Sequence, residues 1–180
     1  MISPPEKPGC YDGILSKDKN LTLILNNHEI TQILCMECCI DALHTAYLDL
    51  ASGIAVTRHR SDTLVPSGES VYGLKTMDGI APSLGVGAVR INSDIVTWPK
   101  IGNAYRRVKV PAAPGERYTG LILLFSLKTG EPLAIMPDGV MQRMRVGATS
   151  AIGTRYLARP NSSVAAIIGS GWQAGAQLMG

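Results

Sequence analysis

A continuously apolar run that leads straight into a glycine-rich turn constrains the fold of this 180-residue chain more than any other feature. Residues Val164 to Ile168 are all apolar, and such a run without alternation is typical of a strand buried on both faces in a parallel sheet. The residues QAGAQLM within and after the turn suit a helix. A buried strand, a glycine turn and a helix in this order predict the start of a doubly wound α/β domain.

The turn has the pattern glycine, any residue, glycine, any two residues, then glycine or alanine. Gly169 permits the tight turn, and Gly171 lets a pyrophosphate approach the backbone closely. Ala174 is small enough for the new helix to pack on its strand, and the helix N-terminus offers free N–H groups to phosphates. The sequence therefore predicts dinucleotide binding by Gly169, Ser170, Gly171, Trp172, Gln173 and Ala174.

The acidic residue that holds the cofactor ribose in such domains follows the glycines by about 20 residues, whereas the chain ends at Gly180. One strand and part of one helix are a small share of the roughly six strands that a complete cofactor domain contains. We therefore expect a truncated chain, whether split, frameshifted or shortened deliberately.

The residues before this segment predict helices and a largely antiparallel sheet. Residues 21–25 favour a strand, and Asn27 is expected to cap a short helix that reaches Leu34. From Met36 to Ala51 apolar residues recur at spacings of three and four, which predicts an amphipathic helix ended by Gly53. Short β-rich runs separated by Gly, Pro, Asn and Asp then follow, at residues 70–76, 86–91 and 105–110.

Two further apolar runs, residues 119–126 and 132–136, flank a loop in which Gly130 can adopt a positive φ, so they predict a β-hairpin. Asp138 is expected to cap a helix from Gly139 to about Ala158. The connection from the antiparallel sheet to the glycine turn is therefore predicted to be helical.

Charge and hydropathy exclude several classes of protein. The net charge of +3 arises from 17 basic and 14 acidic residues without a basic block, so a nucleic-acid partner is not expected. The longest apolar runs are far shorter than the roughly 20 residues of a membrane-spanning helix, and the N-terminal segment lacks the apolar core of a signal peptide. We expect a cytoplasmic protein with no membrane partner.

Cys35 and Cys38 form a CxxC pair, but His28, His44 and His59 stand apart from it. No second spaced pair of ligands completes a zinc site. The cysteines are expected to be ordinary thiols in a reducing compartment, and no metal is predicted.

The sequence resembles the ornithine cyclodeaminase/mu-crystallin family in three stretches that follow one another in order from about residue 21. They are MECCIDALHTAYLDLASGIAVTRHR, YTGLILLFSLKTGEPLAIMPDGVMQRMRVGATSAIGTRYLARP and IIGSGWQAGAQL. The resemblance implies an α/β enzyme of two domains: a substrate-binding and dimerisation domain on an antiparallel sheet, then a Rossmann domain for NAD or NADP. Residues 1–20 would form a flexible arm, 21–137 the first domain, 138–160 a connecting helix and 161–180 the start of the Rossmann domain.

Members of this family transfer hydride to or from amino or imino acids, or cyclise a diamino acid with release of ammonia. In such enzymes two arginines and a lysine of the first domain grip the substrate carboxylate. By position the arginines are Arg60 and Arg145, and Arg90 stands where the family has lysine. Arginine binds carboxylates bidentately but cannot act as a base near neutral pH, which puts ornithine in doubt as the substrate. Lys75 is a second candidate for the lost role, and the catalytic aspartate is expected beyond Gly180.

Each arginine also fits a surface interpretation, because most arginines lie at protein surfaces. Arg60 would then lie in a polar loop, and Arg145 would be a solvated helix residue like Arg143. Two interpretations, a groove lining or an exposed edge strand, fit Trp98, Tyr105, Arg106 and Arg107.

The sequence favours part of an NAD(P)-dependent enzyme that acts on a small amino or imino acid and forms a homodimer. The alternative is a catalytically inert relative that acts as a binding or oligomerising protein, and a third possibility is a gene remnant without a stable fold. The substrate, the reaction direction and the choice between NAD and NADP stay open.

Overall fold

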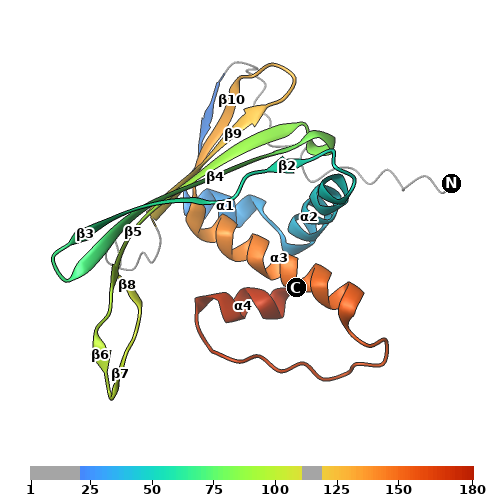
Figure 1. Ribbon diagram of the computed structural model, residues 1–180. Helices are drawn as coiled ribbons and strands as arrows, with labels where there is room; N and C mark the ends of the chain where they lie inside the picture. Colours follow the sequence, from blue (N-terminus) through green and yellow to red (C-terminus); the bar gives the residue numbers. More distant parts are fainter. Residues whose placement is uncertain (1–20, 111–118) are drawn as a thin grey trace.

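The computed structural model describes residues 21–110 and 119–180, and the arm expected at residues 1–20 lies outside them. The described chain is of the mixed α/β class, as predicted, with an eight-stranded sheet and helices packed on one side of it (Figure 1). The order of the sheet is β1-β10-β9-β5-β4-β2, with β3 also paired to β4 and β8 also paired to β5.

The strands of this sheet are β1 (Leu23–Ile24), β2 (Val56–Thr57), β3 (Ser61–Ser67), β4 (Ser70–Ala81), β5 (Val86–Thr97), β8 (Val108–Val110), β9 (Thr119–Ser126) and β10 (Pro132–Pro137). A separate two-stranded ribbon consists of β6 (Lys100–Ile101) and β7 (Ala104–Tyr105). The pairs are antiparallel apart from β1 with β10, which confirms the predicted antiparallel sheet.

Strands β4 and β5 form the spine of the sheet. They pair without interruption from Ser70↔Thr97 to Ala81↔Val86. Both are longer than the predicted runs, because neighbours cover the outer edges: β3 and β2 pair with β4, and β9 and β8 pair with β5. A short 3₁₀ turn, η1 (Pro82–Leu84), joins the two strands and ends at Gly85, whose φ of 68° lies in the left-handed region that favours glycine.

Side chains alternate between the two faces of these strands. The face toward the helices, the inner face, carries Lys75 of β4 and Arg90, Asn92 and Asp94 of β5. The opposite face, the outer face, is apolar and exposed, and it carries Val65, Tyr72, Leu74, Ile95 and Leu121.

The helices are α1 (Asn27–Ile33), α2 (Met36–Ala51), α3 (Asp138–Leu157) and α4 (Trp172–Met179). One core cluster joins α2 to α3 and consists of Met36, Cys39, Ile40, Met144, Ala148 and Ile152. A second cluster, in which Ile30 of α1 packs on Ala134 and Met136 of β10, fixes α1 on the inner face. None of the helices in the described residues is both long and apolar enough to span a membrane.

Two capping predictions were wrong, and their correction explains how the sheet meets α3. Asn26, not Asn27, caps α1 through a capping box with Glu29. The Asn27 side chain instead accepts a hydrogen bond from the backbone N–H of Val140 in the first turn of α3. Because Asn27 satisfies that donor, Asp138 makes no side-chain cap, and its carboxylate turns toward the inner face of the sheet.

The strand predicted at Val164 to Ile168 is also not formed. The residues between α3 and α4 contain no helix or strand, and Val164 is 89% exposed. A buried strand needs neighbours that satisfy its backbone groups and cover its side chains, and no described strand lies beside this run. Helix α4 does follow the glycine turn as predicted, and it packs against α3 where Gly147 lets the Ala176 backbone approach closely.

Asp49 ties the end of α2 to the turn between β4 and β5. Its carboxylate, buried at 6% exposure, accepts hydrogen bonds from the Ser83 backbone N–H at 3.0 Å and from its hydroxyl at 2.6 Å. Asp49→Ala leaves these partly buried donors unsatisfied, so we expect it to lower the free energy of unfolding by about 1–3 kcal/mol. Urea unfolding followed by circular dichroism measures this loss. Asp41→Ala, at an exposed position of the same helix, should change stability by less than about 0.5 kcal/mol, and equal losses would contradict the anchoring role.

Candidate functional site

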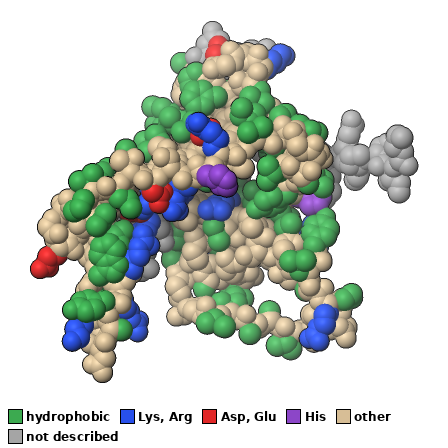
Figure 2. Space-filling model, viewed as in Figure 1, with side chains coloured by type: hydrophobic (Ala, Val, Ile, Leu, Met, Phe, Trp, Pro, Cys, Tyr) green, Lys and Arg blue, Asp and Glu red, His purple; other side chains and the backbone are tan. Residues whose placement is uncertain are grey.

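A pocket lined mainly by cationic side chains lies on the inner face of the sheet, and we call it the cationic pocket. Its volume is about 230 Å³. It is lined by Arg60, Lys75, Arg90, Asn92, Arg107, Lys109, Gln142 and Arg145. The three predicted carboxylate-binding arginines and the candidate Lys75 therefore meet in one place. Figure 2 shows Lys and Arg side chains, with acidic side chains among them, along this side of the sheet near β5 and β8.

Five segments of the chain build the pocket. Lys75 and Asn92 are cross-strand partners on β4 and β5, and Arg90 precedes Asn92 by two residues on the same face. Helix α3 crosses above them and contributes Gln142 and Arg145, which lie three residues apart and so share one side of the helix. Arg60 enters from the break between β2 and β3, and β8 supplies Lys109.

Arg90 is held by a buried carboxylate at the start of α3. Its Nε donates to both carboxylate oxygens of Asp138 at 2.9 Å, and its Nη2 donates to Oδ2 at 2.6 Å. Asp138 is only 2% exposed, and the Asn92 amide also donates to it at 3.4 Å. This fixed pair orients the rest of the Arg90 guanidinium toward the pocket, and it neutralises most of the charge that Arg90 brings.

A second buried carboxylate, Asp94, lies between two lysines. Lys75 Nζ donates to its two oxygens at 2.6 and 2.7 Å, and Lys109 Nζ lies 2.7 Å from Oδ2. Burial alone would raise the pKa of Asp94, but the hydrogen bonds from Lys109 and Lys75 outweigh it and leave that pKa below its ordinary value. Asp94 therefore stays ionised at neutral pH and holds Lys75 in the wall of the pocket.

The other two predicted arginines differ in their partners. Arg60 donates from Nε and Nη2 to the carboxylate of Asp62, at 2.6 and 2.8 Å. Arg145 faces the pocket, and within the part of the chain that the structure describes no carboxylate forms an ion pair with it. Arg145 is an exposed residue of α3, as the surface interpretation expected, but it lines the pocket. The desolvation of its guanidinium there, together with the nearby charge of Arg90, lowers its pKa. Of the three predicted carboxylate-binding arginines, Arg145 is therefore the one that has no carboxylate partner among the described residues.

Among the described residues, the cationic side chains of the pocket outnumber the carboxylates that pair with them. Six cationic side chains line it, and the carboxylates that pair with them in the described residues are Asp62, Asp94 and Asp138. An excess of positive charge in a pocket of this size favours small anions over cations.

Sequence reasoning left Arg107 undecided and missed Lys109, Asp94 and the role of Asp138. A signal was present in the run Arg107-Val108-Lys109, because two cations separated by one apolar residue share a face in a strand. Arg107 lines the pocket, whereas Trp98 and Tyr105 are exposed side chains that do not line it.

The cysteines among the described residues offer no competing site. Cys35 caps α2 by accepting a hydrogen bond from the Cys38 backbone N–H, and Cys35 and Cys39 are free thiols. Cys38 is disulfide-bonded, so the expectation of ordinary thiols was wrong for this residue. Burial, with a contribution from Cys35, raises the pKa of Cys39 to about 11, which makes it a poor nucleophile at neutral pH. Over residues 21–110 and 119–180 no group of three metal-ligating side chains gathers.

The glycine turn lies before α4, away from the secondary structure of the sheet. Gly169 has φ 104°, which requires glycine, and Gly171 is the N-cap of α4 without a side-chain cap. A Cβ at Gly171 would meet nothing within 4 Å, so packing within the described chain does not explain the glycine there. The turn residues and the first turn of α4, Trp172 to Ala174, stay the predicted phosphate site.

Arg143 is not the solvated helix residue that the sequence suggested. Its guanidinium carbon lies 5.3 Å from the centroid of the Trp172 ring, and its Nη2 packs closely on Gly175. Its Nε is buried without a hydrogen-bond partner, as is Oε1 of Gln173. These two unsatisfied polar atoms lie at the first turn of α4.

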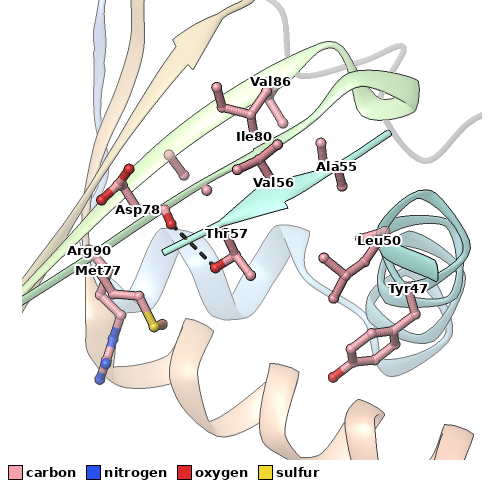
Figure 3. Close-up of a pocket in the computed structure, with 14 residues that line it drawn as sticks. Tyr47, Leu50, Ala55, Val56, Thr57, Met77, Asp78, Ile80, Val86 and Arg90 are labelled. Carbon is pink, nitrogen blue, oxygen red and sulfur yellow. Dashed lines mark hydrogen bonds between the residues drawn. The ribbon is translucent and has the colours of Figure 1, made fainter. Parts of the chain in front are cut away.

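A second pocket, which we call the apolar pocket, lies between α2 and the sheet and has a volume of about 320 Å³. Figure 3 shows Tyr47 and Leu50 of α2 on one side and Val56, Ile80 and Val86 of the strands on the other. Arg90 and Met77 lie at its other end. The two pockets therefore share Arg90 but extend from it in different directions.

Comparison with known proteins gives a family for the C-terminal part of the chain. Residues 100–180 match the profile of the ornithine cyclodeaminase/mu-crystallin family. A relative from Bacillus cereus, a Δ(1)-pyrroline-2-carboxylate reductase, is 42% identical over 55 residues, which are 31% of this chain and 17% of that protein.

Two solved structures are similar over most of the chain. One is a Thermococcus litoralis Δ(1)-pyrroline-2-carboxylate reductase in complex with NADH and L-proline, with 28% identity and a TM-score of 0.68 over 87% of this chain and 44% of that one. The other is an archaeal alanine dehydrogenase dimer with bound NAD, with 29% identity and a TM-score of 0.67 over 87% of this chain and 43% of that one. The chain thus spans less than half the length of the proteins it matches.

Proposed function

We propose that the chain, whose residues 100–180 match the ornithine cyclodeaminase/mu-crystallin family, is a member of that family and supplies the substrate-binding part of an NAD- or NADP-dependent enzyme for small amino or imino acids. The observation that carries the proposal is the cationic pocket, in which Arg60, Arg90 and Arg145 converge. The reaction is hydride transfer to or from the carbon that bears the nitrogen, with cyclising deamination as the variant known in the family.

In this proposal Arg145 is the principal ligand of the substrate carboxylate. Its planar guanidinium can donate two parallel hydrogen bonds to a carboxylate, and no protein carboxylate competes for it within the described chain. Arg90, which is fixed by Asp138, donates a further hydrogen bond to the substrate carboxylate. Arg60, between β2 and β3 at the edge of the sheet, contributes positive charge near it. Lys75, held by Asp94, occupies the neighbouring position on β4 and offers an ammonium hydrogen bond to the bound substrate.

The cofactor in this proposal is held by the glycine turn, with Gly169, Ser170 and Gly171 around the phosphates and the first turn of α4 donating its N–H groups. Two observations support this location: the space beside Gly171 is open, and Arg143 and Gln173 have buried polar atoms without hydrogen-bond partners. A nicotinamide cofactor supplies or accepts the hydride when bound. The catalytic aspartate of the family has no counterpart assigned within this chain.

We further propose that the chain forms a homodimer through the outer face of the sheet. The exposed apolar side chains there, among them Val65 at 55% and Tyr72 at 39% exposure, form a continuous surface on adjacent strands. Such a surface is typical of a protein–protein interface. The same surface favours the second candidate function, an inert oligomerising relative, which differs from the first by having no carboxylate or cofactor affinity.

Calorimetric titration of propionate into the 180-residue chain at low ionic strength tests the proposed function. We expect one saturable site for propionate and none for propylamine, a cation of similar size, because the pocket carries an excess of positive charge. A folded, oligomeric chain that binds neither propionate nor other small carboxylates would contradict the enzyme proposal and favour the inert relative.

A further inference from the structure

We propose that the substrate carries a second carboxylate, so that the enzyme acts on an amino or imino dicarboxylic acid, and that Arg107 with Lys109 receives this second group. This inference rests on the proposed function, because it assumes that the first carboxylate is bound by Arg145 and its neighbours. It names the substrate class, and it assigns a specificity role to residues other than the three predicted carboxylate-binding arginines.

The cations of the pocket form two groups at opposite ends of one stretch of β5. Arg90 and Arg145 meet at the start of α3, while Lys109 pairs with Asp94, four residues further along the strand. Four residues of strand correspond to about 13 Å between Cα atoms, a span across which these long side chains converge on one small pocket. A ligand in the pocket therefore meets cationic side chains of the protein at both of its ends.

Strand β8 places the second group. Val96↔Lys109 is a cross-strand pair, so Lys109 shares the inner face with Asp94 and Val96, and Arg107 precedes it by two residues on that side. Lys109 is partly neutralised by Asp94, which it shares with Lys75. Arg107 has no carboxylate within ion-pair distance in the described residues, so its charge is available to a ligand.

The lining of the pocket argues against the other side chains that a substrate could carry. A diamino acid would bring a second ammonium group against Arg107 and Lys109, which like-charge repulsion opposes. An apolar side chain would meet no apolar residue, because the lining consists of six cations and two amides. An apolar substituent could be accommodated only in the apolar pocket, which lies on the other side of Arg90.

Calorimetric titration of succinate, butyrate and valerate into the 180-residue chain tests the inference. We expect succinate to bind about tenfold or more tightly than butyrate, which has the same number of carbons but one carboxylate, since a charged hydrogen bond corresponds to such a factor. Arg107→Gln should remove that preference while leaving butyrate affinity within about twofold. Arg106→Gln makes the same charge change at the neighbouring position, which does not line the pocket, and it should leave both affinities unchanged.

The possible outcomes separate the two proposals. If succinate and butyrate bind equally to the wild-type chain, or if Arg107→Gln and Arg106→Gln act alike, the second-carboxylate inference is wrong while the carboxylate site stands. Tighter binding of valerate than of succinate would assign the side chain to the apolar pocket and likewise overturn the inference. Failure of all three ligands to bind a folded chain would instead contradict the proposed function itself.

Discussion

Replacing Arg145 by glutamine should weaken the binding of propionate about ten- to a hundredfold, which is the loss expected for a charge-assisted hydrogen bond of about 1.5–3 kcal/mol. The reason is that Arg145 faces the pocket without a carboxylate partner in the described chain, whereas Arg60 and Arg90 are already paired. Arg145→Lys keeps the positive charge but loses the planar fork, so its affinity should fall between those of the wild-type chain and Arg145→Gln. Calorimetric titration of the three proteins measures the series.

The matched control is Arg155→Gln, an exposed arginine near the end of the same helix and outside the pocket. It changes the net charge by the same amount and should leave propionate affinity unchanged. Arg143 does not serve as a control, because it packs on Trp172 and Gly175. Equal effects of the substitutions at 145 and 155 would mean that the affinity reflects the net charge of the chain and that Arg145 is not a carboxylate ligand.

Replacing Asp94 by asparagine should lower the free energy of unfolding by about 3–5 kcal/mol at neutral pH, the range for breaking a buried ion pair. Lys75 is only 7% exposed and would lose the carboxylate that holds it, and Lys109 would lose the same partner. Urea unfolding followed by circular dichroism gives the difference. Asp78→Asn is the control, since its ion pair with Arg58 is exposed and should contribute no more than about 1 kcal/mol.

The pH dependence of this loss has a defined sign. The folded-state pKa of Asp94 lies below its ordinary value of 3.8, so its ionised form stabilises the folded chain at any pH above that value. As the pH falls from about 4 through the lowered pKa, the carboxylate is protonated and this stabilisation is lost. The stability difference between wild type and Asp94→Asn should therefore be constant from neutral pH to about 5 and shrink in stronger acid. A difference that grows on acidification would contradict the assigned ion pairs.

Local patterns predicted the elements that local forces determine. Helix α2 extends from Met36 to Ala51 as its apolar spacing indicated, and the β9–β10 hairpin forms around Gly130. The family resemblance contributed Arg60, Arg90 and Arg145, which three separate segments bring into one pocket. Their roles as carboxylate ligands stay predictions until the titrations above are made.

Features that depend on distant partners could not be read in the same way. The run Val164 to Ile168 has the composition of a buried strand, but a strand also needs neighbouring strands to pair with. The segment between α3 and α4 has no such neighbour among the described residues and forms no strand. Aspartate is a common helix cap, but here the Asn27 side chain of α1 accepts the hydrogen bond from Val140 N–H at the start of α3. The Asp138 carboxylate instead accepts hydrogen bonds from Arg90. The position of β8 beside β5 follows from pairing across the chain, so nothing local indicated that Lys109 would reach Asp94.

The contrast between the two faces of β4 and β5 also bears on how the chain avoids misfolding. In the native pairing Tyr72 lies opposite Ile95 on the apolar side, and Lys75 lies opposite Asn92 on the charged side. A slip of one residue would turn every side chain of β4 to the opposite side, exposing Lys75 among apolar groups and bringing Tyr72 among cations. Such a mispaired intermediate would lose the bond of Lys75 to Asp94 as well as the apolar contacts, so it would be short-lived. The alternation of side chains that forms the binding site therefore also favours the native register of β4 and β5 over a shifted one.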